Sequence, residues 1–278
     1  MRLKLAKTSI EISGEDGSLA GRYVYADPYK PYLHPLLTPS GVPMSAFMPH
    51  DHKHHRALMY ALRTPELNFW EERVTVPEER VGRQVHRELA DVVEVGDTVG
   101  FTQQLAWCAV DDKVPVFIET RRLSCTGSSD GHGFAWTWST RLEAQSDVTL
   151  RMSQWSSPRA DGALVNYHGL GLRLPREFGD SMASLVVRLD GRETTIANAH
   201  GQTPTSIEYR GAADGYWPVR FGGVRFTQQQ PNALFIMKDP FAYIALGPSN
   251  LAPRALARGE TIEEHYAIDV FDAEPHGG

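Results

Sequence analysis

Residues 85–145 contain the pattern that most constrains the fold, which is a series of short runs with alternating side-chain polarity. In the run "FTQQLAWCA", Phe101, Leu105 and Trp107 fall on one face. Phe134, Trp136 and Trp138 share a face in a later run. Turn sequences rich in Gly, Asp and Ser separate the runs, at residues 96–97, 111–113 and 127–131. Period two between such turns is typical of β-strands and predicts an antiparallel meander.

The second half of the chain continues in the same way. "SLVVRLDGRETTIANA" contains an Asp190-Gly191 hairpin signal. Residues 223–250 predict three strands, interrupted at residues 231–232 and 239–240, and residues 256–275 predict a turn and a last strand. Short helices are expected only near residues 53–63 and 176–185. The prediction is an all-β protein, a large antiparallel β-sandwich with few short helices, in a single domain over residues 1–278.

Composition excludes several classes of protein. The chain has 28 Lys and Arg against 34 Asp and Glu, a net charge of −6 without a basic run, which argues against nucleic-acid binding. We find no signal peptide and no apolar run long enough to span a membrane. Cys108 and Cys125 lie in separate predicted strands, as reduced core thiols would. We therefore expect a cytoplasmic protein with no membrane partner.

The most unusual feature is a cluster of histidines in "MPHDHKHHRAL". His50, His52, His54 and His55 lie within six residues and are followed by Arg56. In an extended segment the first three would share a face, and in a helix His52 and His55 would. Either arrangement suits metal ligation, proton transfer or hydrogen bonding to a ligand. A structural role in the loop is the plainer alternative, but four close imidazoles must stay mostly neutral at pH 7.

Other residues could complete such a site. His168 precedes Arg173 in "NYHGLGLRLP", and Glu119 lies in the otherwise apolar strand "VFIETRRL". Trp70 precedes two glutamates in "NFWEE", where a tryptophan could stack on a sugar ring or belong to the core. His34, in "YLHPLLTPSG", precedes a proline and therefore has extended backbone. A turn histidine, a surface arginine and a carboxylate paired with arginine are the structural alternatives.

These motifs, in this order, resemble the bacterial family known as PmoA-like or DUF6807. That family has similar "HP…TPSG", "DHxHHRGL" and "FWGE" segments. This chain differs at Lys53, where proline is usual, at Ala57, where glycine is usual, and in "FWEE", which ends in Glu72. The closing segment "LARGETIEEHYAIDV" is also similar to the galactose-mutarotase-like super-sandwich group. That second resemblance implies sugar binding on a β face, with histidine and carboxylate as acid and base.

From the residues and the resemblance together, we expect a carbohydrate-active enzyme of the isomerase or epimerase, lyase or glycoside hydrolase type. Its ligand would be a monosaccharide, a glycoside or a keto-sugar derivative. The expected catalytic residues are His52, His54, His55, His168 and Glu119. The expected substrate-binding residues are His34, Arg56, Trp70 and Arg173.

Two alternatives belong to other classes. In the first, the histidines and Glu119 or His168 hold a divalent metal, although no HExxH or CxxC motif supports this. In the second, the protein binds sugar without turnover. We otherwise expect no cofactor, and a homo-oligomer is compatible with the sequence.

Overall fold

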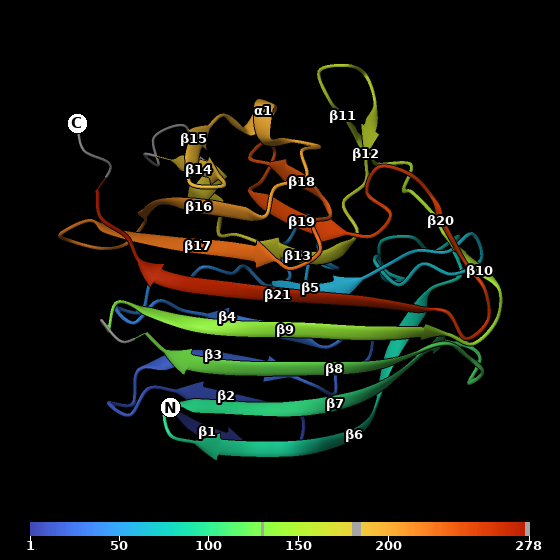
Figure 1. Cartoon of the computed structure of the whole chain (residues 1–278), viewed down its shortest axis with the longest axis horizontal. Helices are drawn as coiled ribbons and strands as arrows, with labels where there is room; N and C mark the ends of the chain where they lie inside the picture. The colour runs from blue at the N-terminus through green and yellow to red at the C-terminus, as the bar shows by residue number, and fades with distance from the viewer. Residues whose placement is uncertain (129–130, 180–184, 276–278) are drawn as a thin grey trace.

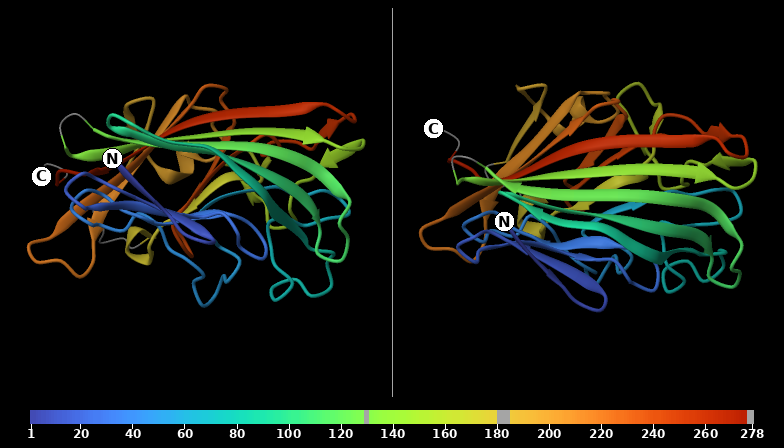
Figure 2. Two further views of the ribbon diagram at one scale, coloured as in Figure 1. Left: turned by 90° about the horizontal axis from the view of Figure 1, so that it is seen from below. Right: turned by 60° about the horizontal axis from the view of Figure 1, so that its bottom comes forward.

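The computed structural model describes residues 1–128, 131–179 and 185–275, and it is built almost entirely of β-strands. Figure 1 looks onto the larger of two antiparallel sheets, and Figure 2 shows the two sheets as stacked layers. The prediction of an all-β antiparallel sandwich is confirmed.

The nine-stranded sheet contains the predicted meander as its long strands. Its strands in spatial order are β15 (Arg192–Thr194), β14 (Val186–Leu189), β16 (Ser206–Ala213), β17 (Arg220–Gln228), β21 (Thr261–Asp272), β9 (Gly133–Ala144), β8 (Pro115–Gly127), β7 (Thr98–Ala109) and β6 (Gly82–Val95). All neighbours are antiparallel, and the Asp190-Gly191 turn joins β14 to β15 as predicted.

The eight-stranded sheet combines the N-terminal strands with three strands from the second half of the chain. Its order is β1 (Arg2–Leu5), β2 (Ser9–Ser13), β3 (Leu19–Val24), β4 (Tyr32–Leu36), β5 (Leu58–Ala61), β13 (Gly169–Arg173), β19 (Tyr243–Gly247) and β18 (Ala233–Met237). Two small ribbons lie outside these sheets, β10 (Val148–Leu150) with β20 (Arg254–Leu256) and β11 (Ser157–Pro158) with β12 (Leu164–Val165).

Helical structure is limited to two single turns in the described residues. They are the 3-10 turn η1 (Arg176–Gly179) and the helix α1 (Ile196–Ala199), which Thr195 caps. The helix expected near residues 53–63 is wrong, because this segment is a loop followed by β5. The run Ala57–Leu62 is buried on both faces, so it lacks the alternation that identifies a strand. The expectation for 176–185 is met by η1 alone, and residues 180–184 lie outside the described part.

One hydrophobic core fills the space between the sheets. Leu58 and Tyr60 from β5 and Ile244 and Leu246 from β19 belong to it, together with Trp107 from the opposite sheet. Alternate residues point the other way and form a second cluster, whose members are Tyr32, Met59, Ala61, Trp70, Val165, Tyr167, Phe235, Tyr243 and Ala245. The eight-stranded sheet therefore buries both faces, and its outer face carries an aromatic layer.

Glycines in β13 make room for this layer. A Cβ atom on Gly171 would lie 1.8 Å from the Tyr243 hydroxyl oxygen and 3.3 Å from the Trp70 ring. Gly169 has φ of +99°, and a Cβ atom there would lie 2.0 Å from the Leu246 carbonyl oxygen. These positions explain why "HGLGLRL" alternates glycine with leucine. The leucines face the core, while Gly171 makes room for the aromatic side chains and Gly169 for the backbone of β19.

Candidate active site on the outer face of the eight-stranded sheet

The histidines lie on a loop between β4 and β5, held by turn hydrogen bonds. The amide of Met48 donates to the carbonyl oxygen of His55 at 2.9 Å, and the amide of His55 donates to that of His52 at 3.0 Å. Met48 and Ala57 adopt positive φ values of 46° and 57° at the two ends. Left-handed backbone favours glycine. This geometry gives a physical reason for the glycine that the resembling family places where this chain has Ala57.

The loop brings three imidazole rings together. The ring centroids of His54 and His55 are 4.6 Å apart, those of His52 and His55 are 4.8 Å apart, and those of His52 and His54 are 5.8 Å apart. Phe241 packs edge-on against His52 and His55, at 4.5 and 5.1 Å. Neither of the geometries expected from the sequence, extended strand or helix, is present. Two tight turns produce the cluster instead.

Burial keeps two of these rings neutral. It lowers the pKa of His54 to about 3, with the charge of Lys30 adding to the effect. Burial also lowers the pKa of His55 well below its ordinary value, and the neighbouring histidines reinforce this. Within the described part of the chain, Nδ1 of His54 and Nδ1 of His55 have no hydrogen-bond partner. Neutral imidazoles with unpartnered nitrogens can accept or donate a hydrogen bond to a ligand.

His52 differs because it has a carboxylate beside it. Asp51 Oδ2 lies 3.3 Å from His52 Nδ1, an ion-pair approach without the direction of a hydrogen bond. Asp51 is itself held by Arg176, at 2.7 Å. A carboxylate beside one ring nitrogen orients an imidazole. Half-buried His52 is thus an oriented ring that lines the cavity, whereas burial holds His54 and His55 neutral.

A carboxylate from another segment forms a second polar part of the site. Glu71 is buried, and its Oε1 accepts a hydrogen bond of 2.8 Å from the Tyr167 hydroxyl. Ser153 Oγ lies 2.7 Å from that hydroxyl and completes a short chain. Burial and the Glu71 charge raise the pKa of Tyr167 well above its usual value, so the phenol remains a donor. Glu71 Oε2 has no partner among the described residues.

The two polar parts line one cavity with a volume of about 770 Å³. Aromatic side chains form much of its wall, and the ring of Trp70 lies 5.1 Å from Tyr167 and 5.7 Å from Tyr243. Trp155, in the loop before β11, also lines the cavity and is 67% exposed. The volume is in the range of small-molecule sites, which combine apolar walls with a few polar groups.

Trp70 is a wall residue of this cavity, as predicted, but only 1% of it is exposed. The side chain of Asn68 fixes its position, accepting hydrogen bonds of 3.0 Å from the amides of Trp70 and Glu71. The buried ammonium of Lys30 donates to the Trp70 carbonyl oxygen. The exposed tryptophan available for stacking is therefore Trp155, which the sequence analysis did not select.

His168 lies behind this wall rather than in it. It is fully buried, its ring is 5.8 Å from that of Trp70, and it does not line the cavity. Burial lowers its pKa to about 3, and the charge of Arg63 adds to this. His168 can position Trp70, but the described structure does not bring it into contact with the histidine cluster.

Glu119 is not part of the site, and the expectation that it partners the histidines is wrong. It lies in the core between the sheets, fully buried, and forms two hydrogen bonds of 2.8 Å with Arg121. Trp107 Nε1 and Thr140 Oγ1 also donate to it, at 2.8 and 3.0 Å. Inward-facing positions of β8 carry this pair, so the carboxylate is structural. Pairing with an arginine was the alternative explanation from the sequence.

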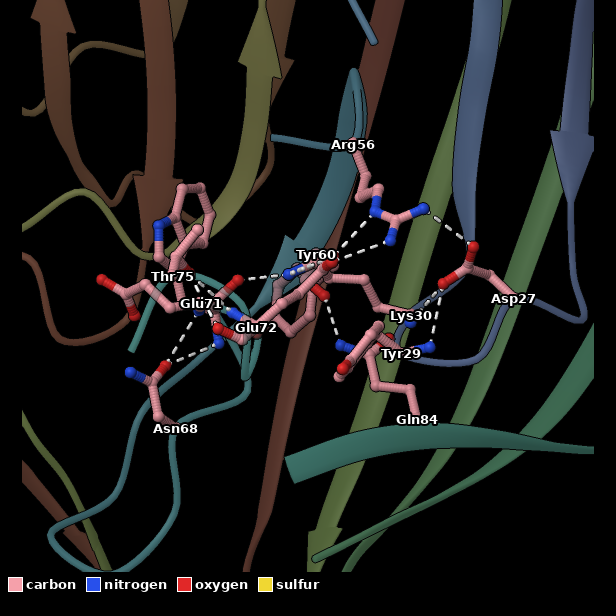
Figure 3. A network of polar contacts seen from close by, with 11 residues as sticks. Asp27, Tyr29, Lys30, Arg56, Tyr60, Asn68, Glu71, Glu72, Thr75 and Gln84 are labelled. Atoms are coloured by element: carbon pink, nitrogen blue, oxygen red, sulfur yellow. Dashed lines mark hydrogen bonds and ion pairs between the residues drawn. The ribbon is translucent and has the colours of Figure 1, made fainter. Parts of the chain in front are cut away.

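Arg56 is also structural, which corrects its prediction as a substrate-binding residue. Figure 3 shows its guanidinium between Asp27 and Glu72, with the Glu71 carboxylate pointing away from it. Nε and Nη2 bond to Glu72 at 2.7 and 2.8 Å, and Nη1 bonds to Asp27 at 2.9 Å. With its nitrogens engaged by carboxylates, Arg56 anchors the end of the histidine loop.

His34 lies outside the cavity as well. Its Nδ1 is 2.9 Å from Ser45 Oγ, and its ring stacks on Phe47 at 5.3 Å. Burial lowers its pKa to about 4, and Arg22 adds to the effect. It supports the loop that leads to the histidine cluster, and it does not line the cavity.

Arg173, also predicted to bind substrate, is a buried arginine without a counter-charge bonded to it in the described structure. Its guanidinium carbon lies 3.9 Å from the centroid of Phe241, directly beside the histidine cluster. The side chain is fully buried, and none of its three nitrogens has a hydrogen-bond partner in the described structure. Burial lowers its pKa to about 10. This arginine is close to the cavity without lining it.

The described residues do not meet the requirements of a metal site or of a membrane-spanning helix. No group of three or more His, Cys, Asp or Glu side chains in them is arranged to hold a metal ion. No helix in residues 1–128, 131–179 and 185–275 has the length and hydropathy needed to cross a membrane. Both cysteines are buried and unpaired.

Sequence reasoning selected the histidine cluster, but it missed several residues around it. Glu71 was noticed only as a neighbour of Trp70, and it occupies the position of the glycine in "FWGE". Tyr167 precedes His168 in the sequence, where nothing marks it as a site residue. Phe241 and Tyr243 gave no signal beyond a strand pattern, because their role depends on which face of β19 meets the loop.

The chain is similar to a protein family and to a solved structure. No curated protein matches the chain. A solved structure described as a galactose mutarotase related enzyme from Lactobacillus acidophilus is similar over 99% of this chain and 97% of its own, with 8% identity and a TM-score of 0.33. The model of a family of unknown function, DUF6807, matches residues 12–277. The chain therefore belongs to the DUF6807 family.

Proposed function

We propose that this protein is an enzyme that acts on a carbohydrate by acid–base chemistry in the cavity of the eight-stranded sheet. The observation that carries the proposal is that three imidazoles and the buried Glu71 carboxylate line one aromatic cavity. A sugar presents apolar ring faces and hydroxyl edges, which aromatic walls and polar groups match. Trp155 provides the exposed ring for stacking.

The chemistry would use groups at both polar parts of the cavity. His52, oriented by Asp51, can take a proton from a hydroxyl or from a carbon next to a carbonyl group, and later return it. Glu71, with one oxygen held by Tyr167 and the other unpartnered, can accept a proton or hold a hydroxyl. His54 and His55 are neutral at pH 7 and serve as hydrogen-bond partners. Epimerisation, elimination and hydrolysis all use these two proton transfers.

The test begins with a thermal-shift screen of monosaccharides, methyl glycosides and 3-keto sugars. Any sugar that stabilises the protein is then followed by NMR in D2O, which detects both deuterium incorporation and new products. We expect His52→Ala and Glu71→Gln to lower kcat/KM by about 10²- to 10⁴-fold, the usual contribution of an acid or base. The matched control is His265→Ala, since this histidine bonds Ser139 on the other sheet and should leave kcat/KM unchanged.

The same experiments, together with metal analysis, distinguish an acid–base enzyme from a sugar-binding protein and from a metal-dependent enzyme. Saturable sugar binding without deuterium incorporation or product would identify a sugar-binding protein rather than an enzyme. A chelator-removable divalent ion, at about one per chain in untagged protein, would identify a metal-dependent enzyme. Full activity of both His52→Ala and Glu71→Gln would refute the acid–base assignment.

A further inference from the structure

The orphan guanidinium of Arg173 indicates a property of the ligand. β13 places Leu170 and Leu172 in the core, so Gly171 and Arg173 point to the outer face. In the antiparallel register Arg173 lies opposite Tyr243, a residue of the cavity wall. Phe241, which covers the guanidinium, also lines the cavity and contacts His52 and His55. The arginine is thus one side chain away from the proposed active site.

The absence of a partner is unusual for a buried arginine. Arg56 and Arg121 are both buried, and each forms two hydrogen bonds with a single glutamate. Arg173 Nε, Nη1 and Nη2 have none within the described residues. A buried charge without a counter-charge is strongly unfavourable, and proteins keep such groups mainly at functional sites. The missing partner is therefore expected to be an anion supplied by the ligand.

The charges that face Arg173 are compatible with this. Among the described residues, the charges that act on Arg173 are the carboxylate of Asp51 and the guanidinium of Arg176, which are bonded to each other. The uncharged neighbours are His55, whose pKa burial lowers well below its ordinary value, and the Tyr243 phenol, whose pKa burial raises well above its usual value. An incoming anion therefore meets the positive charges of Arg173 and Arg176, and the Asp51 carboxylate near them is already paired.

The stacking on Phe241 leaves the binding edge of the guanidinium free. All five N–H donors of arginine lie in its plane, so a ring against its face does not compete for them. The planar fork matches the two oxygens of a carboxylate, or two oxygens of a phosphate. Because the guanidinium is closed off from solvent, the partly buried Phe241 must turn aside for an anion to enter from the cavity.

We propose that Arg173 binds an anionic group of the substrate, so that the ligand is an acidic sugar carrying a carboxylate or a phosphate. The proposal builds on the function proposed above, and it adds the chemical class of the ligand. Arg173 then determines specificity, while proton transfer remains with His52 and Glu71.

The experiment compares sugars that differ only in the charged group. Glucose, glucuronate and glucose 6-phosphate are titrated by calorimetry into wild-type protein, Arg173→Met and Arg173→Lys. We expect one of the two acidic sugars to bind at least about tenfold more tightly than glucose, and which one it is distinguishes carboxylate from phosphate. Arg173→Met should abolish the preference, and Arg173→Lys, which keeps the charge but loses the fork, should retain part of it.

Thermal unfolding provides a readout that does not depend on the choice of sugar. Without ligand, Arg173→Met should be at least as stable as wild type, because the substitution removes an unpaired buried charge. If Arg173→Met does not fold, Arg173→Lys still tests the preference. Equal binding of the neutral and acidic sugars, or a preference that survives in both variants, would overturn the proposal.

The two proposals can fail separately. Binding of neutral and acidic sugars alike, with turnover, would leave the proposed function standing and remove the anion site. If no sugar binds, the proposed function fails, and stabilisation by inorganic phosphate or acetate then decides on Arg173. Stabilisation that is lost in Arg173→Met supports the anion site, and no stabilisation overturns it.

Discussion

Buried arginines differ between the core and the outer face of the eight-stranded sheet. In the core between them, Arg121 has a partner for each of its nitrogens: Glu119, the Tyr23 hydroxyl at 3.1 Å and the Gln84 side-chain oxygen at 3.0 Å. On the outer face of the eight-stranded sheet, Arg173 and His55 keep unpartnered nitrogens although both side chains are buried. Complete satisfaction is characteristic of structural polar groups, whereas unsatisfied groups mark places where a ligand is expected. The comparison thus separates a stabilising cluster from a binding site.

The largest expected effect tests the stabilising role of the buried Arg121–Glu119 pair. Arg121→Ala should lower the free energy of unfolding by about 3–5 kcal/mol, because it leaves the buried Glu119 carboxylate without its counter-charge. Urea or guanidinium unfolding, followed by tryptophan fluorescence, measures this. The matched control is Arg141→Ala on the neighbouring strand β9, whose half-exposed side chain pairs with Glu263 at 3.2 Å. The control should cost less than about 1 kcal/mol, and equal losses in the two variants would contradict the comparison.

The pH dependence of stability tests the outer face. The pKa of His54 is lowered to about 3 in the folded state, so the unfolded chain takes up a proton first as pH falls below about 6.5. The stability from this neutral ring is fully present above pH 6.5 and is lost as pH falls toward 3. The loss is at most about 1.4 kcal/mol per pH unit for one histidine.

Urea unfolding at pH 7.0, 6.0, 5.0 and 4.5 measures this slope in wild type and in His54→Gln. In His54→Gln, stability should fall less steeply with decreasing pH, by up to about 1.4 kcal/mol per pH unit, which is the contribution of one proton. His265→Gln on the other sheet should keep the wild-type slope. A His54→Gln slope identical to that of wild type would show that folding does not lower the pKa of this ring.

The smallest expected effect tests the backbone strain at Ala57, at the end of the histidine loop. Ala57 has φ of +57°, which costs an alanine more than a glycine. Ala57→Gly should therefore raise the free energy of unfolding by about 1 kcal/mol or less, since the greater freedom of glycine in the unfolded chain offsets part of the gain. Thermal unfolding of this variant beside Ala46→Gly, a loop alanine outside the positive-φ residues, measures it. A loss of stability at position 57 would contradict the strain argument.

The sequence by itself determined the strands of the meander and the histidine cluster. Alternation in residues 101–109 and the turns at 96–97 and 111–113 are local, so they specify the meander wherever it packs. Four histidines within residues 50–55 bring at least two imidazoles together in a strand, in a helix or in the two tight turns that are present. The match of residues 12–277 to the DUF6807 family agrees with the motifs of that segment.

Only the tertiary structure decided which polar residues join the cluster. Glu119 and Glu71 look alike in sequence, but one points into the space between the sheets and the other lines the cavity. The sequence predicts substrate binding for both Arg56 and Arg173, but the guanidinium of Arg56 is bonded to two carboxylates, whereas that of Arg173 has no hydrogen-bond partner among the described residues. A strand's period reveals which residues share a face. Which sheet, loop or carboxylate covers that face depends on contacts between distant segments, and single-strand periodicity carries no information on those contacts.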